Sequence, residues 1–164
     1  MMDYSRKALV GDIGGTNIRF AISDFDELTI DHFASLRTAD FASPQEALKQ
    51  YLRTIPSCPD RVGLAVPGPV LGGAATMSNV PWSFTKDDIR AVTGAKEVQL
   101  INNFEAVALM VPHLTDFDLF TIGKTRPAVP MATKVVIGVG TGLGVAALFT
   151  SPSGSFAKIG RAHV

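Results

Sequence analysis

The fold is decided by residues 8–24, which read ALVGDIGGTNIRFAISD. An apolar run over residues 8–12 ends at glycines, and residues 17–24 then alternate between apolar and polar side chains. Alternation with a period of two is typical of a strand with one buried face, and a glycine pair between two such runs is typical of a tight turn. This stretch therefore predicts two strands joined by a glycine turn.

The same pattern returns near the end of the chain. Residues 134–139 and 143–150 are apolar runs on either side of a second glycine turn, Gly138 to Gly144. A hairpin that occurs twice indicates two related α/β lobes. We expect a nearly complete small lobe over residues 1–113 and the beginning of a larger lobe over residues 114–157.

The sequence between the two hairpins predicts an alternation of strands and helices. We expect strands over residues 28–36, 61–66, 97–101 and 117–122, and helices over residues 44–53, 85–93 and 102–114. Ser43, Pro44 and Glu46 have the spacing of a helix N-terminus, and Gly94 is placed to end the second helix.

Composition narrows the class of protein. The chain is 46% hydrophobic and 18% charged, values typical of a globular domain. Because 15 basic residues balance 15 acidic ones and no basic run is present, we expect no nucleic-acid partner. The early apolar run is too short for a signal peptide or membrane anchor, and the single cysteine, Cys58, suits a reducing compartment. The expected location is the cytoplasm, with no membrane partner.

The first glycine turn carries groups that suit a phosphate. Backbone amides at Gly14 and Gly15 can approach phosphate oxygens, Thr16 adds a hydroxyl donor, and Asp12 stands at a strand end, where it could orient Mg²⁺ or a metal-bound water. Alone, this turn is more simply explained as a plain hairpin. The second turn, with alternating glycines around Thr141, also exposes backbone amides. Two such turns, one in each lobe, predict a nucleotide held between the lobes.

A third polar group stands where the strand over residues 97–101 meets the next helix. Asn102 and Asn103 occupy this junction, a position at which polar side chains face a cleft in α/β sheets. Either asparagine could instead serve only as the N-cap of the helix.

Five segments together resemble one family. GDIGGTNIRFAISD, LAVPGPV, MSNVPWSF, INNFEAVA and GVGTGLGVA occur in the order seen in bacterial glucokinases of the hexokinase/actin-like ATPase superfamily, from about Ala8 to about Leu148. The resemblance implies an α/β actin-like ATPase (ribonuclease-H-like) fold. It also implies that the full-length protein transfers the γ-phosphate of ATP to glucose, giving glucose 6-phosphate for glycolysis.

The resemblance also implies roles for individual residues. The first phosphate loop matches Gly11, Asp12, Ile13, Gly14, Gly15 and Thr16, and the second matches Gly140, Thr141 and Gly142. ATP and Mg²⁺ are the implied cofactors, with Asp12 near the metal. The implied sugar-binding residues are Asn79, Trp82, Asn102 and Asn103. The resemblance is also compatible with a homodimer of the full-length protein.

One position departs from the family pattern. The family's Ile-Asn-Asp-Phe has an aspartate that accepts the proton of the sugar's 6-hydroxyl, and this chain has Asn103 there. An amide cannot take that proton at neutral pH. Two other functions stay open: a sugar-binding homologue without catalysis, and a kinase for another hexose such as mannose or an N-acetylated hexose. A sugar-sensing repressor is disfavoured, since the chain begins almost at its first strand, with no helix-turn-helix before it.

The last residues form the second departure. The family continues into a sugar-binding Glu-Gly-Gly-His segment, whereas this chain reads KIGRAHV over residues 158–164. These residues can be encoded by the start of a widely used sequencing adapter. We therefore expect residues 158–164 to be a non-native tail on a gene fragment, and we expect the fragment itself to be inactive. The coding DNA decides this, because other codons at 159–164 contradict it.

Overall fold

The computed structural model describes residues 6–78, 80–124, 127, 129–139 and 143–160. The chain forms two compact units, which divide between Asn103 and Phe104. The boundary at residue 113, which the sequence suggested for the lobes of a whole protein, stays a prediction.

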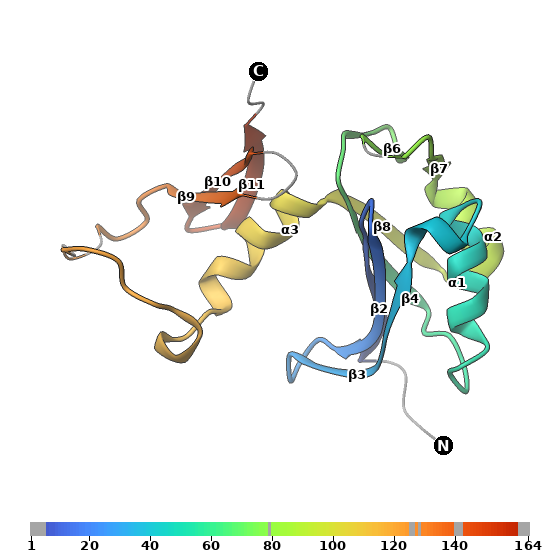
Figure 1. The fold of residues 1–164 in the computed structure, drawn as a ribbon. Coiled ribbons are helices and arrows are strands. Elements are labelled where there is room, and N and C mark those ends of the chain that lie inside the picture. Colours follow the sequence, from blue (N-terminus) through green and yellow to red (C-terminus); the bar gives the residue numbers. More distant parts are fainter. Residues whose placement is uncertain (1–5, 79, 125–126, 128, 140–142, 161–164) are drawn as a thin grey trace. The chain divides into compact units, whose positions relative to one another are not determined.

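Unit 1 is built on a five-stranded sheet with the order β3-β2-β1-β4-β8 (Figure 1). The strands are β1 (Lys7–Ile13), β2 (Asn17–Asp24), β3 (Thr29–Arg37), β4 (Arg61–Val66) and β8 (Glu97–Asn102). β1, β2 and β3 form an antiparallel meander, whereas β4 pairs in parallel with β1 on one side and with β8 on the other. These strands were all predicted from the sequence.

Two helices cover one face of this sheet (Figure 1). α1 (Pro44–Leu52) begins at Ser43, whose hydroxyl accepts a hydrogen bond from the amide of Glu46, as predicted. α2 (Lys86–Thr93) begins at Thr85 and ends at Gly94, which adopts the left-handed conformation that favours glycine. Alternate side chains of the strands pack against the helices and form the core, including Leu9, Ile13, Phe20, Leu48, Tyr51, Leu64, Ile89 and Leu100.

A small antiparallel sheet was not predicted. It consists of β5 (Val70–Leu71), β6 (Ala74–Thr76) and β7 (Ser83–Thr85), and it precedes α2. Each of its strands has two or three residues, which is too short for a periodic pattern to show in the sequence. A 3-10 helix, η1 (Thr38–Asp40), follows β3.

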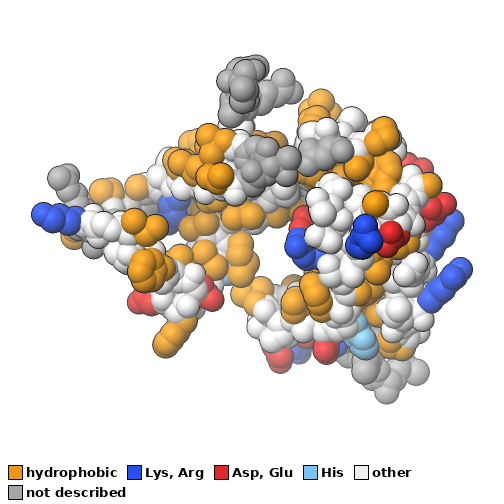
Figure 2. All heavy atoms as spheres, in the orientation of Figure 1, with side chains coloured by type: hydrophobic (Ala, Val, Ile, Leu, Met, Phe, Trp, Pro, Cys, Tyr) orange, Lys and Arg blue, Asp and Glu red, His pale blue; other side chains and the backbone are white. Residues whose placement is uncertain are grey.

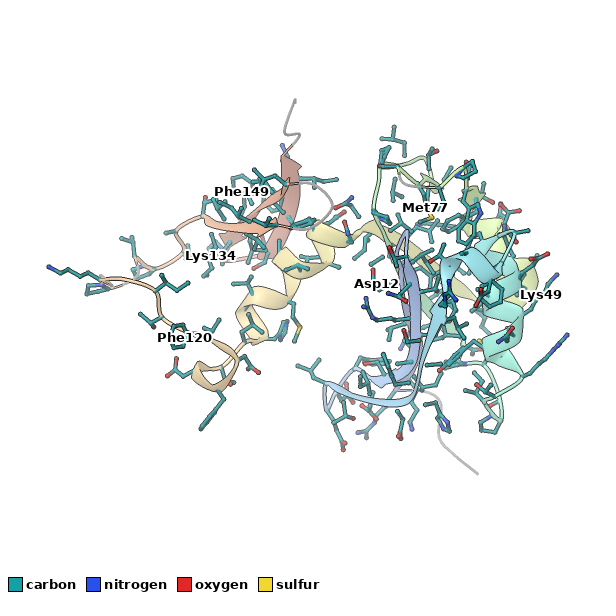
Figure 3. The ribbon with its side chains drawn as sticks, in the orientation of Figure 1. Asp12, Lys49, Met77, Phe120, Lys134 and Phe149 are labelled. Atoms are coloured by element: carbon teal, nitrogen blue, oxygen red, sulfur yellow. The ribbon has the colours of Figure 1, made fainter. Side chains whose placement is uncertain are left out.

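Unit 2 consists of α3 (Asn103–Met110), whose first residue is counted with unit 1, and a three-stranded antiparallel sheet of order β11-β10-β9. Its strands are β9 (Lys134–Val139), β10 (Leu143–Ser151) and β11 (Gly154–Gly160). The hairpin of β9 and β10 was predicted. β11 was not predicted, and its last residues, 158–160, belong to the expected tail. Phe156 of β11 stacks on Phe149 of β10, and Phe149 is labelled in Figure 3.

Two predictions for unit 2 need correction. The helix expected to reach residue 114 ends as an α-helix at Met110 and continues as the 3-10 helix η2 (Val111–His113), since Pro112 lacks the amide that would extend it. The strand expected over residues 117–122 is wrong. That segment begins within the 3-10 helix η3 (Asp116–Asp118), and no described strand pairs with it, so its backbone lacks the partner that a strand requires.

No helix in the described part of the chain is both long enough and apolar enough to cross a membrane.

The environment of Cys58 gives a simple chemical test of unit 1. Burial raises the pKa of the Cys58 thiol to about 11, and the nearby carboxylate of Asp60 adds to the rise. Because the thiolate is the reactive form, a rise of this size should slow thiol-disulfide exchange by about 10²-fold at pH 8 relative to an unfolded cysteine. The measurement is the rate of reaction with an aromatic disulfide reagent with and without urea. Equal rates in the two conditions contradict this burial of Cys58.

Candidate active site

Parallel pairing brings three chain segments to the same edge of the unit 1 sheet. β1, β4 and β8 run in the same direction, so their carboxyl ends lie together. The segments that leave this edge are the Gly14–Thr16 turn, the loop of residues 67–69 and the start of α3. Ligands of open α/β sheets bind at the carboxyl ends of the strands, which makes this edge the candidate site.

The first glycine turn is tightly closed. The amide of Gly14 donates to the carbonyl of Asn17 at 2.9 Å, and a β-carbon on Gly14 would lie only 2.6 Å from that oxygen. A side chain at Gly14 would therefore collide with the backbone of the turn. The Ile13 side chain is completely buried in the core, so this residue can reach a ligand only through its backbone.

Thr38 fastens this turn, a role that the sequence did not reveal. Its hydroxyl donates to the carbonyl of Gly14 at 2.7 Å, and its amide donates to the carbonyl of Thr16 at 3.0 Å. Thr38 is only 2% exposed, although it lies in a short polar stretch that resembles a loop. The two bonds hold the carbonyls of the turn, so that its shape is set before any ligand arrives.

Asp12 lies on the face of the sheet away from α1 and α2 (Figure 3). Its Oδ2 accepts a hydrogen bond from Nη1 of Arg19 on β2 at 3.0 Å, and its side chain is 45% exposed. An exposed ion pair of this kind contributes little free energy, so a divalent cation could compete with Arg19. Mg²⁺ typically binds one or two carboxylates together with waters and phosphate oxygens, and Asp12 beside a glycine turn suits that arrangement.

The side chain of Asn102 holds the loop of residues 67–69. Its Nδ2 donates to the carbonyl of Gly68 at 2.9 Å and to that of Val66 at 3.4 Å, and the residue is 8% exposed. From the other side, the hydroxyl and amide of Ser78 both donate to the carbonyl of Pro67. The side-chain amide of Asn102 therefore fastens the 67–69 loop to the end of β8.

The remaining predicted residues have different environments. Asn103, at the first position of α3, is partly buried. Trp82 belongs to the hydrophobic core and is 9% exposed, so most of its ring packs against protein atoms. Asn79 lies outside the described residues, as do Gly140, Thr141 and Gly142 at the tip of the second glycine turn. The strands that carry this turn, β9 and β10, are described and pair up to Val139 and Leu143.

The fold and this edge define the class of protein. Parallel strands flanked by a glycine hairpin fit the actin-like ATPase fold that the sequence predicted, and solved structures confirm that fold. A glucokinase from an Antarctic psychrotroph superposes with a TM-score of 0.82 at 32% identity, covering 97% of this chain and 53% of that one. A ROK-family glucokinase from Streptomyces griseus, solved with glucose and AMPPNP, shares the fold with a TM-score of 0.66 at 20% identity, covering 96% of this chain and 47% of that one.

Sequence comparison identifies the family. The glucokinase family model matches residues 9–162, so this chain belongs to the glucokinase family. The glucokinase of Caulobacter vibrioides is 38% identical over 143 residues, which are 85% of this chain and 43% of that protein. The chain therefore spans less than half the length of this relative.

The role of Thr38 can be tested by Thr38→Val, which keeps the shape and removes the hydroxyl. Losing the bond to Gly14 should lower the free energy of unfolding by about 1 kcal/mol and speed hydrogen exchange of the Gly14 amide. The fluorescence of Trp82, the only tryptophan in the sequence, reports the urea unfolding.

Thr54→Val is the matched control for this test. The Thr54 hydroxyl also donates to a backbone carbonyl, that of Tyr51 at 2.7 Å, but this bond is at the end of α1 and does not involve the turn. Equal acceleration of Gly14 exchange by both variants contradicts the role of Thr38.

Proposed function

We propose that this chain is the front part of an ATP-dependent glucokinase, which works in the cytoplasm and forms glucose 6-phosphate. The observation that carries the proposal is the meeting of the Gly14–Thr16 turn, the 67–69 loop and the asparagine pair at one sheet edge in a member of this family. The lobes over residues 1–113 and 114–157, and the non-native tail over residues 158–164, belong to the same proposal.

The first glycine turn would hold phosphate oxygens of ATP. The amide of Gly14 is already bonded to the carbonyl of Asn17, so the amide of Gly15 and the hydroxyl of Thr16 would be the donors, and Thr38 keeps the turn in one shape. Asp12 would hold Mg²⁺ directly or through water, and the metal would neutralise charge on the phosphates. The second turn, through Gly140, Thr141 and Gly142, would bind phosphate from the other lobe.

The asparagine pair would bind and orient the sugar. Asn102, fixed by its bonds to the 67–69 loop, would lie beside a sugar hydroxyl at this edge. In the reaction, the 6-oxygen forms a bond to the γ-phosphorus while the bond from that phosphorus to the β,γ-bridging oxygen breaks, releasing ADP. The proton of the 6-hydroxyl must leave to a base, and Asn103 cannot accept it.

Position 103 therefore separates sugar binding from turnover. Asn103 keeps the size of an aspartate and most of its hydrogen-bonding capacity, while lacking its basicity. A sugar-binding homologue without catalysis is the second candidate function, and Asn103 is the residue that favours it. Specificity for glucose over mannose or N-acetylated hexoses is part of the first proposal.

The first functional prediction concerns a completed protein, in which residues 1–157 are followed by the C-terminal half of the gene or of a close relative. Asn103→Asp should raise kcat by about 10²-fold or more, because a general base acts in the transition state. The glucose Kd should change only modestly. The measurement is kcat and the glucose Kd of the completed protein with and without Asn103→Asp. Asn103→Ala is the control, which should weaken glucose binding without raising turnover. Equal kcat for the completed protein with and without Asn103→Asp contradicts the assignment of the base.

The second functional prediction concerns the 164-residue chain by itself. Hydrophobic side chains gather on the surface of unit 2 (Figure 2), and Val139 on β9 is 90% exposed. Apolar strands exposed in this way lower solubility. We expect poor solubility and no phosphorylation of glucose in a coupled assay, because this chain by itself spans less than half the length of its glucokinase relative. Product above a no-protein control contradicts this expectation.

A further inference from the structure

Two glycines of the second hairpin leave a space that one aromatic ring fills. Gly138 on β9 and Gly144 on β10 stand directly opposite each other in the antiparallel ladder. A β-carbon on Gly138 would lie 2.6 Å from Cζ of Phe104, and a β-carbon on Gly144 would overlap Cε2 and Cζ of the same ring. The Phe104 ring thus lies directly against the backbone of both strands.

The rest of this face follows the same pattern. Directly opposite residues of an antiparallel pair share a face, and every second residue along each strand joins them. Val136, Ala146 and Leu148 lie on this face and pack with α3, where Ala108 is fully buried. In the described part of the hairpin, the Gly138–Gly144 pair is the one position on this face without side chains. The side chain that fills this position is Phe104, the largest side chain of α3.

These contacts fix the first turn of α3. Phe104 is the second residue of this helix, and Ala108, one turn later, anchors the helix to the same face of the hairpin. Neighbouring residues on a helix differ by about 100° around its axis, so a helix held through Phe104 carries residue 103 to the side of the contact. The ring therefore fixes the rotation of α3 about its axis relative to the hairpin, and Asn103 is the residue next to it in this helix.

We propose that Phe104 is a positioning residue for position 103, and that Gly138 and Gly144 are glycines because they admit its ring. This inference rests on the proposed function, since it takes residue 103 as the site of the catalytic base. It also gives these two glycines a structural role, apart from any contact with phosphate.

The test uses the completed protein carrying Asn103→Asp. Phe104→Ala should lower its kcat by about 10²-fold, because a displacement of roughly 1 Å at a reacting group has an effect of that order. The glucose Kd should stay within about threefold of its starting value, because Asn102 and the 67–69 loop keep their own bonds. Phe104→Leu, which fills part of the space, should recover part of the lost kcat. Val107→Ala is the matched control, on the same helix but half exposed, and should leave kcat unchanged.

The glycine variant makes the test specific. Gly144→Ala should lower kcat as Phe104→Ala does, since the new methyl group would displace the ring. The double variant should then be no slower than Phe104→Ala alone, because the space that the methyl group enters is already empty. Fully additive losses, or a glucose Kd that weakens in parallel with kcat, overturn the proposal.

Thermal unfolding tests the packing of the Phe104 ring independently of the proposed catalytic function. If the completed protein carrying Asn103→Asp phosphorylates no hexose, the proposed function fails, and with it the positioning role. The packing still has its own readout, since the Tm losses of Phe104→Ala and Gly144→Ala should be non-additive. Additive Tm losses contradict the seating of the ring between the two glycines.

Discussion

The parallel pairing of β4 with both β1 and β8 is the constraint on which the site depends. It places the ends of three strands, distant in the sequence, at one edge of the sheet. The core between the sheet and the helices α1 and α2 fixes the strands themselves, with Leu9, Leu64 and Leu100 all buried in it. Any change that shifts the pairing register moves the glycine turn, the 67–69 loop and the asparagine pair relative to one another.

Side chains that bind backbone carbonyls then set the shape of that edge. Thr38 holds Gly14 of the turn, Asn102 holds Gly68 of the loop, and both donors are almost completely buried. A buried donor that loses its acceptor costs more free energy than an exposed one, so each bond favours a single loop conformation. In unit 2 the corresponding role belongs to packing, where the ring of Phe104 lies against two glycines.

The sequence predicted those parts of the fold that depend on local pattern. The strands of the main sheet and the N-terminus of α1 at Ser43 follow from periodicity and capping residues. The contacts of Thr38 and of the Asn102 amide could not be predicted, because each joins residues more than 20 positions apart without a sequence signature. A helix was predicted around Phe104, but the gap that its ring fills appears only when β9 and β10 pair. The β5–β7 strands are too short for periodicity to detect.

The central claim is that this sheet edge belongs to a kinase that prefers glucose. Its most direct test is the rate of ATP-dependent phosphorylation by the completed protein carrying Asn103→Asp, measured with glucose, mannose and N-acetylglucosamine at equal concentrations. We expect glucose 6-phosphate as the main product, with the highest kcat/KM for glucose. Phosphorylation of one of the other two sugars in preference to glucose, or of none of the three, would contradict it.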